Sequence, residues 1–230
     1  MARKSKLERF AELDSFPNVF QCTDPDSHQV RNYRNEYMDM QGSWSEKAFQ
    51  NGRPLILELA CGKGEYTVAL GQAHPENNYI GIDIKGNRMH RGAKKAISLQ
   101  LNNVAFLRIR IEWILKHFGE KELDQIWITF PDPFLKKSKS NRRLTSPMFQ
   151  EHYRQLLKSQ GVVHLKTDSQ ELYEFTLETL SETKNIRIMS QSEDIDRDGL
   201  TKDDLLIQTY YESQHREVGK TIKYISWQYI

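Results

Sequence analysis

The stretch LILELACGKGEYTVALGQA, residues 55–73, contains the pattern that decides the fold. Its first six residues are apolar except for Glu58 and predict a buried strand. Gly62 and Gly64 then make a G-x-G turn, and residues 65–73 predict a helix. A strand, a glycine turn and a helix in this order are typical of doubly wound α/β folds, in which the glycines let the backbone approach a ligand closely.

The alternation of strands and helices continues along the chain. Further strands are predicted at residues 79–84, 104–109, 123–130, 161–167, 186–190 and 221–229, and further helices at 87–99, 112–118, 146–158, 170–181 and 205–217. This order indicates an α/β fold with a mostly parallel, seven-stranded sheet and helices on both faces, over a domain of residues 51–230. Residues 1–50 are polar and weakly patterned. We expect a partly irregular N-terminal extension there, whose basic start (Arg3, Lys4 and Lys6) is a possible RNA-contacting arm.

The composition excludes several classes of protein. The chain has 230 residues, 38% of them hydrophobic, and no apolar run approaches the length of a membrane span. The basic start MARKSKLERF has no apolar stretch after it and is not a secretory signal. Cys22 and Cys61 have neither the spacing of a disulfide framework nor that of metal ligands. These features favour a cytoplasmic protein with no membrane partner and no metal.

Positive charge is concentrated in two places, although the net charge is only +2. Residues 136–143 contain five Lys and Arg side chains and no acid, and residues 85–95 form a second basic cluster. Lys and Arg hold nucleic-acid phosphates in register without reading the sequence. The alternative is that the first run is a solvated loop and that part of the second cluster balances acids elsewhere.

Four carboxylates lie in or directly after predicted strands: Glu58, Asp83, Asp132 and Asp168. Ligands of parallel sheets bind beyond the carboxyl ends of the strands, so we expect these side chains at one crevice. Glu58 either belongs to a buried ion pair or faces a cationic ligand group such as an α-amino group. Asp83 either caps the next helix or accepts hydrogen bonds from ribose hydroxyls.

Asp132 stands between Pro131 and Pro133, directly after a strand. The two prolines restrict the backbone on both sides, which suits a rigid, aimed carboxylate better than an ordinary turn residue. Asp168 either caps the following helix or lies beside Asp132. His164, in the middle of a strand, is interpreted as a core histidine.

Five segments in a fixed order resemble the bacterial tRNA (guanine-N7-)-methyltransferase family: ELACGKGE, YIGIDIKGNR, ITFPDPFLKKSKSNRRLT, HLKTD and TYYE. The resemblance runs from about residue 54 to the C-terminus. It implies a Rossmann-like class I fold and transfer of a methyl group from S-adenosylmethionine to N7 of a guanine in the tRNA variable loop. A methyltransferase of another substrate and a non-catalytic RNA-binding protein with this fold are the alternatives. The protein would be a monomer or a homodimer.

The resemblance also implies a role for each matching residue. Asp132 would be the catalytic acid. The cofactor would be bound by Glu58, Gly62, Gly64, Asp83, Arg110 and Asp132. Contacts to the substrate would come from Lys136, Asp168, Thr209, Tyr210, Tyr211 and Glu212. Arg142 and Arg143 would meet the RNA backbone.

At four positions the chain departs from the family pattern. Arg110 replaces an aspartate near the expected adenine and cannot accept a hydrogen bond from the adenine amino group, so backbone or Glu112 would have to do so. Phe134 stands in place of Trp, Thr129 in place of Asn, and Asp83 in place of Glu.

Overall fold

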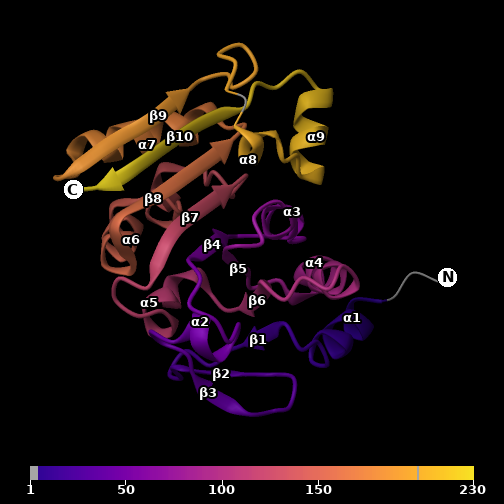
Figure 1. The fold of residues 1–230 in the computed structure, drawn as a ribbon. Helices are drawn as coiled ribbons and strands as arrows, with labels where there is room; N and C mark the ends of the chain where they lie inside the picture. Colours follow the sequence, from indigo (N-terminus) through magenta and orange to yellow (C-terminus); the bar gives the residue numbers. More distant parts are fainter. Residues whose placement is uncertain (1–4, 201) are drawn as a thin grey trace.

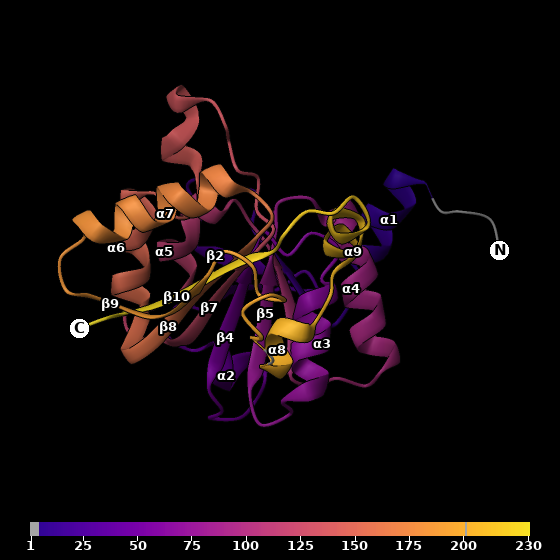
Figure 2. The same cartoon turned by 90° about the horizontal axis from the view of Figure 1, so that it is seen from above.

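A single twisted sheet passes through the molecule, with helices on both of its faces (Figures 1 and 2). The computed structural model describes residues 5–200 and 202–230, so the predicted arm residues Arg3 and Lys4 lie outside the described residues. Ten strands are formed in the described part: β1 (Val19–Gln21), β2 (Gln29–Arg31), β3 (Tyr37–Asp39), β4 (Leu55–Leu59), β5 (Asn78–Ile82), β6 (Val104–Arg108), β7 (Leu123–Thr129), β8 (Leu157–Thr167), β9 (Ile186–Ser192) and β10 (Lys223–Tyr229).

The strands are ordered β3-β2-β1-β6-β5-β4-β7-β8-β10-β9. From β6 to β8 all neighbours are parallel, and β10 is antiparallel to both β8 and β9. This confirms the mostly parallel α/β class. The chain leaves β4 for β5 on one side and returns to β7 on the other, so a crevice opens at the carboxyl end of β4.

The expected count of seven strands is wrong, because the N-terminal region extends the sheet. β1 pairs in parallel with β6, and the β2–β3 hairpin continues the same sheet beyond β1. Val19 and Phe20 are buried in this edge. Each of these strands has only three residues, too few for an alternating pattern to stand out from the sequence. The N-terminal region therefore supplies three short edge strands to the sheet.

Helices cover the two faces of the sheet separately. The bounds are α1 (Lys6–Leu13), α2 (Trp44–Lys47), α3 (Glu65–Ala73), α4 (Gly86–Ser98), α5 (Ile114–His117), α6 (Pro147–Leu156), α7 (Gln170–Glu182), α8 (Asp203–Leu206) and α9 (Tyr210–Glu217), with 3₁₀ turns η1 (Ile111–Trp113) and η2 (Lys137–Arg142). One apolar core contains side chains of α2, α5, α6 and α7, and the other contains side chains of α1, α3, α4 and α8. Figure 2 shows these two layers on either side of the strands.

The glycine turn packs α3 against α4. Gly64 has a φ of 69°, which favours glycine, and a Cβ there would lie 2.4 Å from the Phe106 ring. A Cβ on Gly92 of α4 would lie 2.6 Å from the Lys63 carbonyl oxygen. Both glycines are therefore needed for close packing, and they fix α4 directly against the turn that follows β4.

The single helix predicted at residues 205–217 is two helices, α8 and α9. Thr209 begins α9 as its N-cap, since its side chain accepts a hydrogen bond from the Glu212 amide. The carbonyl oxygens of Leu205 and Ile207 accept hydrogen bonds from Lys166 Nζ, at 2.7 and 2.9 Å. These carbonyl oxygens accept hydrogen bonds from a side chain of β8 and not from the amides of a continuing helix, so α8 ends here.

Candidate active site

A pocket of about 860 Å³ opens at the carboxyl ends of β4, β5 and β7. Its size is ordinary for a small-molecule or cofactor site. Nine of the predicted site residues line it: Glu58, Gly62, Asp83, Arg110, Asp132, Arg142, Asp168, Thr209 and Tyr211. Five do not: Gly64, Lys136, Arg143, Tyr210 and Glu212.

Glu58 is a buried carboxylate at the floor of this pocket. Its Oε2 accepts hydrogen bonds from the amide and the hydroxyl of Thr67, and its Oε1 accepts one from the Thr129 hydroxyl at 2.6 Å. Burial raises the pKa of the Glu58 carboxyl to about 7, against the lowering effect of these donors. No ion pair to Glu58 exists in the described chain, so the structural alternative of a buried ion pair does not hold. One lone pair of Oε1 remains for a cationic ligand group.

Asp83 lines the same pocket and holds the glycine turn through its side chain. Its Oδ2 accepts a hydrogen bond from the Gly62 amide at 3.0 Å, and its Oδ1 accepts one from the Lys85 amide at 2.7 Å. Each oxygen keeps a second lone pair. Gly62 has a φ of 55°, and a Cβ there would have only the Ala60 carbonyl oxygen within 4 Å, so the turn leaves space above it for a ligand.

We expect Asp83→Ala to weaken the binding of S-adenosylmethionine and to leave tRNA binding nearly unchanged. The variant loses a carboxylate that can accept ribose hydroxyls, and the loss of a hydrogen bond to a charged group costs about 1.5–3 kcal/mol. Calorimetry measures both affinities. Asp83→Glu, which restores the residue type usual in the resembling family, is the control and should recover most of the affinity. An unchanged affinity in Asp83→Ala would contradict a ribose contact.

Arg110 lies on the rim of the pocket, after β6. Its guanidinium is exposed and pairs with the Glu112 carboxylate at 3.4 Å, and it lies 5.9 Å from the centre of the Trp113 ring. Both Arg110 and Glu112 line the pocket. The only hydrogen-bond acceptors that this segment offers an amino group there are the Glu112 carboxylate and the backbone.

Asp132 lies on a loop that is held in place by hydrogen bonds to its backbone. Its Oδ1 accepts a hydrogen bond from the Phe134 amide at 3.1 Å, and its side chain is exposed at the pocket. Arg143 holds this loop, because its guanidinium donates to the carbonyl oxygens of Pro133 (3.0 Å) and Phe134 (3.2 Å). Phe130 and Phe134 have positive φ angles of 47° and 42°. The backbone is therefore strained two residues before and two residues after Asp132.

The prediction that Arg143 meets the RNA backbone is wrong, because its side chain is 7% exposed and stacks on the Phe175 ring. A charged residue so well buried supports the loop and cannot reach a phosphate. Arg142, its neighbour, is exposed and lies over the Phe134 ring at 4.8 Å. Lys136 is exposed on the outer part of the loop, just before η2.

Asp168 lies at the end of β8 and does not cap the next helix, whose N-cap is Ser169. Its Oδ2 is 2.6 Å from Lys220 Nζ and 3.4 Å from His215 Nδ1. All three side chains line the pocket. Sequence patterns missed His215 and Lys220, since neither belongs to a motif and both are brought to Asp168 by the return of the chain into β10.

The substrate segment predicted at residues 209–212 divides into exposed and buried parts. Tyr210 is exposed, and the Lys63 ammonium group lies 3.4 Å from the centre of its ring. Glu212 was expected to contact the substrate, but it is fully buried and pairs with Lys166 Nζ at 2.7 Å. Its role is therefore to hold α9 over the end of β8.

The known proteins that this chain resembles are methyltransferases. A family described as putative methyltransferase matches residues 52–225. A tRNA (guanine-N(7)-)-methyltransferase of Bacteroides fragilis is 43% identical, with 97% of this chain and 85% of the relative covered. One of Christiangramia forsetii is also 43% identical, with 98% of each chain covered. The chain belongs to the tRNA (guanine-N(7)-)-methyltransferase family.

Solved structures show that the family fold extends to distant methyltransferases. A 16S rRNA methyltransferase, KamB, superposes with a TM-score of 0.60 at 11% identity, over 83% of this chain and 94% of that one. The antibiotic-resistance methyltransferase Kmr gives a TM-score of 0.57 at 13% identity, over 85% and 95%. At such low identity the likeness concerns the fold alone.

Two further features of the described residues bear on the kind of protein. No helix among them combines the length and the apolar character needed to cross a bilayer. No cluster of His, Cys, Asp and Glu side chains in the same residues has a geometry that could hold a metal ion.

Proposed function

We propose that this protein transfers a methyl group from S-adenosylmethionine to N7 of a guanine in the variable loop of tRNA. The proposal is supported most directly by Asp132, a carboxylate exposed at the mouth of a cofactor-sized pocket on a loop bordered by basic side chains. Family membership supports the same reaction. We place the protein in the cytoplasm, as a monomer or a homodimer.

The pocket suits S-adenosylmethionine in its volume and in the charge of its lining. Glu58, a buried carboxylate without a cationic partner among the described residues, would receive the α-amino group of the methionine part. Asp83 would accept the ribose hydroxyls, and the open backbone at Gly62 would lie beneath them. The adenine amino group would donate to Glu112 or to backbone near Arg110. When bound, the cofactor supplies a methyl group on positively charged sulfur.

The chain's own residues then have to align the guanine and stabilise charge. N7 of guanine carries a free lone pair, so no general base is needed. Alignment of the two reactants alone lowers the barrier by up to about 7–11 kcal/mol in ideal cases. As the methyl group moves, positive charge develops on the purine ring. A fixed carboxylate at Asp132 stabilises this charge and accepts hydrogen bonds from N1–H and the exocyclic amine.

A methylation assay tests the proposal. Total tRNA is incubated with the protein and labelled S-adenosylmethionine, and 7-methylguanosine is mapped by aniline cleavage of the product. We expect label and cleavage at a guanine of the variable loop. Label at other positions would indicate another RNA methyltransferase, and tRNA binding without label would indicate a non-catalytic RNA-binding protein.

We expect Arg142→Ala to raise the KM for tRNA and to flatten its salt dependence. Each lost phosphate contact lowers the slope of log affinity against log salt by roughly 0.7–0.9. Arg142→Lys retains the charge and should retain the slope, although it loses part of the stacking on Phe134. Arg143→Ala should instead lower kcat, because it releases the Pro133 and Phe134 carbonyls. A wild-type slope in Arg142→Ala would mean that this residue only covers Phe134.

A further inference from the structure

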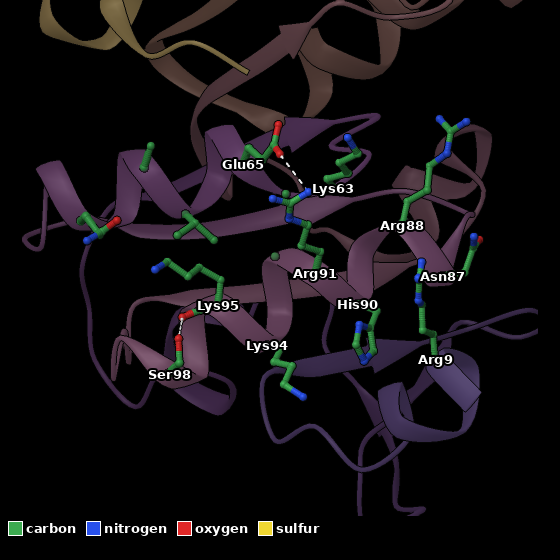
Figure 3. Close-up of a pocket in the computed structure, with 15 residues that line it drawn as sticks. Arg9, Lys63, Glu65, Asn87, Arg88, His90, Arg91, Lys94, Lys95 and Ser98 are labelled. Atoms are coloured by element: carbon green, nitrogen blue, oxygen red, sulfur yellow. Dashed lines mark hydrogen bonds and ion pairs between the residues drawn. The ribbon is translucent and has the colours of Figure 1, made fainter. Parts of the chain in front are cut away.

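A second hollow, the α3–α4 groove, lies beside the cofactor pocket. It has a volume of about 1000 Å³ and is bordered by α1, α3 and α4 (Figure 3). Six Lys and Arg side chains line it, and Glu65 is the one acid among its lining residues in the described chain. Lys63, Glu65 and Arg88 line both hollows, so the groove starts where the pocket ends.

Most of the positive charge in the α3–α4 groove is not neutralised within the described residues. Lys94 pairs with Glu12 at 3.0 Å, and the same carboxylate receives His90 at 2.7 Å. Arg91 is 4.0 Å from Glu65, whose other oxygen accepts the Tyr210 amide (Figure 3 shows Arg91 pointing to Glu65). The other four basic side chains of the groove make no ion pair within residues 5–200 and 202–230: Arg9, Lys63, Arg88 and Lys95. The groove therefore attracts anions.

Helix stability does not explain the basic residues of α4. Arg88, Arg91 and Lys95 follow one another at spacings of three and four residues, which places them along one face of the helix. Like charges at these spacings destabilise a helix. The first turn contains Arg88 and no acid, which also opposes the helix dipole. A bound polyanion would relieve both effects.

The position of α4 makes it a rigid extension of the pocket. The contact of Gly92 with the Lys63 carbonyl fixes the helix against the glycine turn, as described above. From Arg88 to Lys95 the helix rises roughly 10 Å.

We propose that the α3–α4 groove binds backbone phosphates of the tRNA outside the nucleotide that enters the pocket. The inference rests on the proposed function, since it takes tRNA as the molecule that occupies the pocket. The groove and the Arg142 loop border different sides of that pocket, so they hold the RNA at two separate places. The groove positions the whole tRNA, whereas the pocket holds only the target guanine.

The test compares two double variants that each lose one Arg and one Lys. Arg91→Ala/Lys95→Ala removes charge from the α3–α4 groove, and neither of the two substituted residues itself lines the cofactor pocket. Lys184→Ala/Arg187→Ala removes the same charge at the start of β9, at the opposite end of the sheet, and is the matched control. Both pairs are exposed, and thermal unfolding checks that both variants fold.

Binding of full-length tRNA is measured by fluorescence anisotropy at several salt concentrations, and KM and kcat by methyl transfer. For Arg91→Ala/Lys95→Ala we expect a KM raised on the order of tenfold and a salt slope reduced by roughly 0.7–0.9 per lost contact. The control should behave as wild type. A short oligonucleotide centred on the target guanine cannot reach the far end of α4, so the groove variant should bind it as well as wild type does.

Two results would overturn the proposal. A salt slope of the groove variant equal to that of the control would make the groove a solvated surface. An equal loss of affinity for the short oligonucleotide would make Arg91 and Lys95 part of the pocket. The proposed function is judged separately, by whether the wild-type protein methylates tRNA at all. Anisotropy needs no methyl transfer, so the two failures are distinguishable.

Discussion

Asp132→Asn should lower turnover by about 10²-fold or more and leave the fold and the cofactor affinity nearly intact. The amide has almost the shape of the carboxylate, and its oxygen can still accept the Phe134 amide hydrogen bond. It cannot carry the charge that balances the methylated purine, nor can both of its ends accept hydrogen bonds from the guanine edge. Single-turnover rates with saturating tRNA and cofactor measure the effect.

The competing interpretation of Asp132, a turn residue after a strand, has a matched control in this chain. Asp194 Oδ1 accepts the amide of Asp196, two residues on, at 3.1 Å, as Asp132 accepts that of Phe134, and it also accepts the amide of Arg197 at 3.2 Å. Asp194→Asn should therefore change stability by a similar small amount and leave the single-turnover rate unchanged. If Asp132→Asn also stayed within a few-fold of the wild-type rate, the active site would have to be placed elsewhere.

The central part of the fold was predictable from sequence because its elements have strong local patterns. The helix predicted at 65–73 is α3, residue for residue, and the strands around it are correct to within a few residues. Asp83 and Asp132 were predicted at the crevice because carboxyl ends of parallel strands meet there. The glycine pattern, however, did not distinguish Gly62, which faces the pocket, from Gly64, which packs against Phe106.

The remaining features depend on contacts between residues far apart in the chain. Glu212 and Lys166 are ordinary charged residues in their own segments, and only the fold buries them against each other. Arg143 follows Arg142 directly, yet one is buried under the Pro133 carbonyl and the other is exposed. A basic run in a sequence therefore gives the sign of the charge near a site, but not which of its side chains reach the ligand.

Glu58→Gln should reduce the affinity for S-adenosylmethionine and at the same time stabilise the ligand-free protein above pH 7. Burial raises the pKa of the Glu58 carboxyl from 4.5 to about 7, so the folded state holds its proton more tightly than the unfolded state. With the pKa raised, the stability contributed by this group is full below pH 4.5 and is lost as the pH rises to about 7. The loss is of the order of 3 kcal/mol at 1.36 kcal/mol per pKa unit.

Glutamine removes this titration and can keep the contacts to Thr67 and Thr129. Its oxygen can accept both Thr67 donors, and its amide can donate to the Thr129 hydroxyl, which then acts as the acceptor. The denaturant midpoint of the wild-type protein should fall between pH 5 and pH 8, whereas Glu58→Gln should lack this component. The same pH profile in both proteins would mean that ionisation of the buried Glu58 carboxyl costs no stability.

The affinity for the cofactor should rise as Glu58 ionises, whereas the stability of the ligand-free protein falls. The α-amino group needs the ionised carboxylate, so wild-type affinity should decrease as the pH falls below about 7, and loss of the charge should weaken binding by about 1.5–3 kcal/mol at pH 8. Thr129→Val keeps the carboxylate but removes a donor that lowers its pKa, so the pH at which affinity declines should move upward. Calorimetry across pH distinguishes these profiles. An affinity in Glu58→Gln that equals that of wild type at pH 8 would place the α-amino group away from this carboxylate, and the buried charge would then have to be explained by another cation.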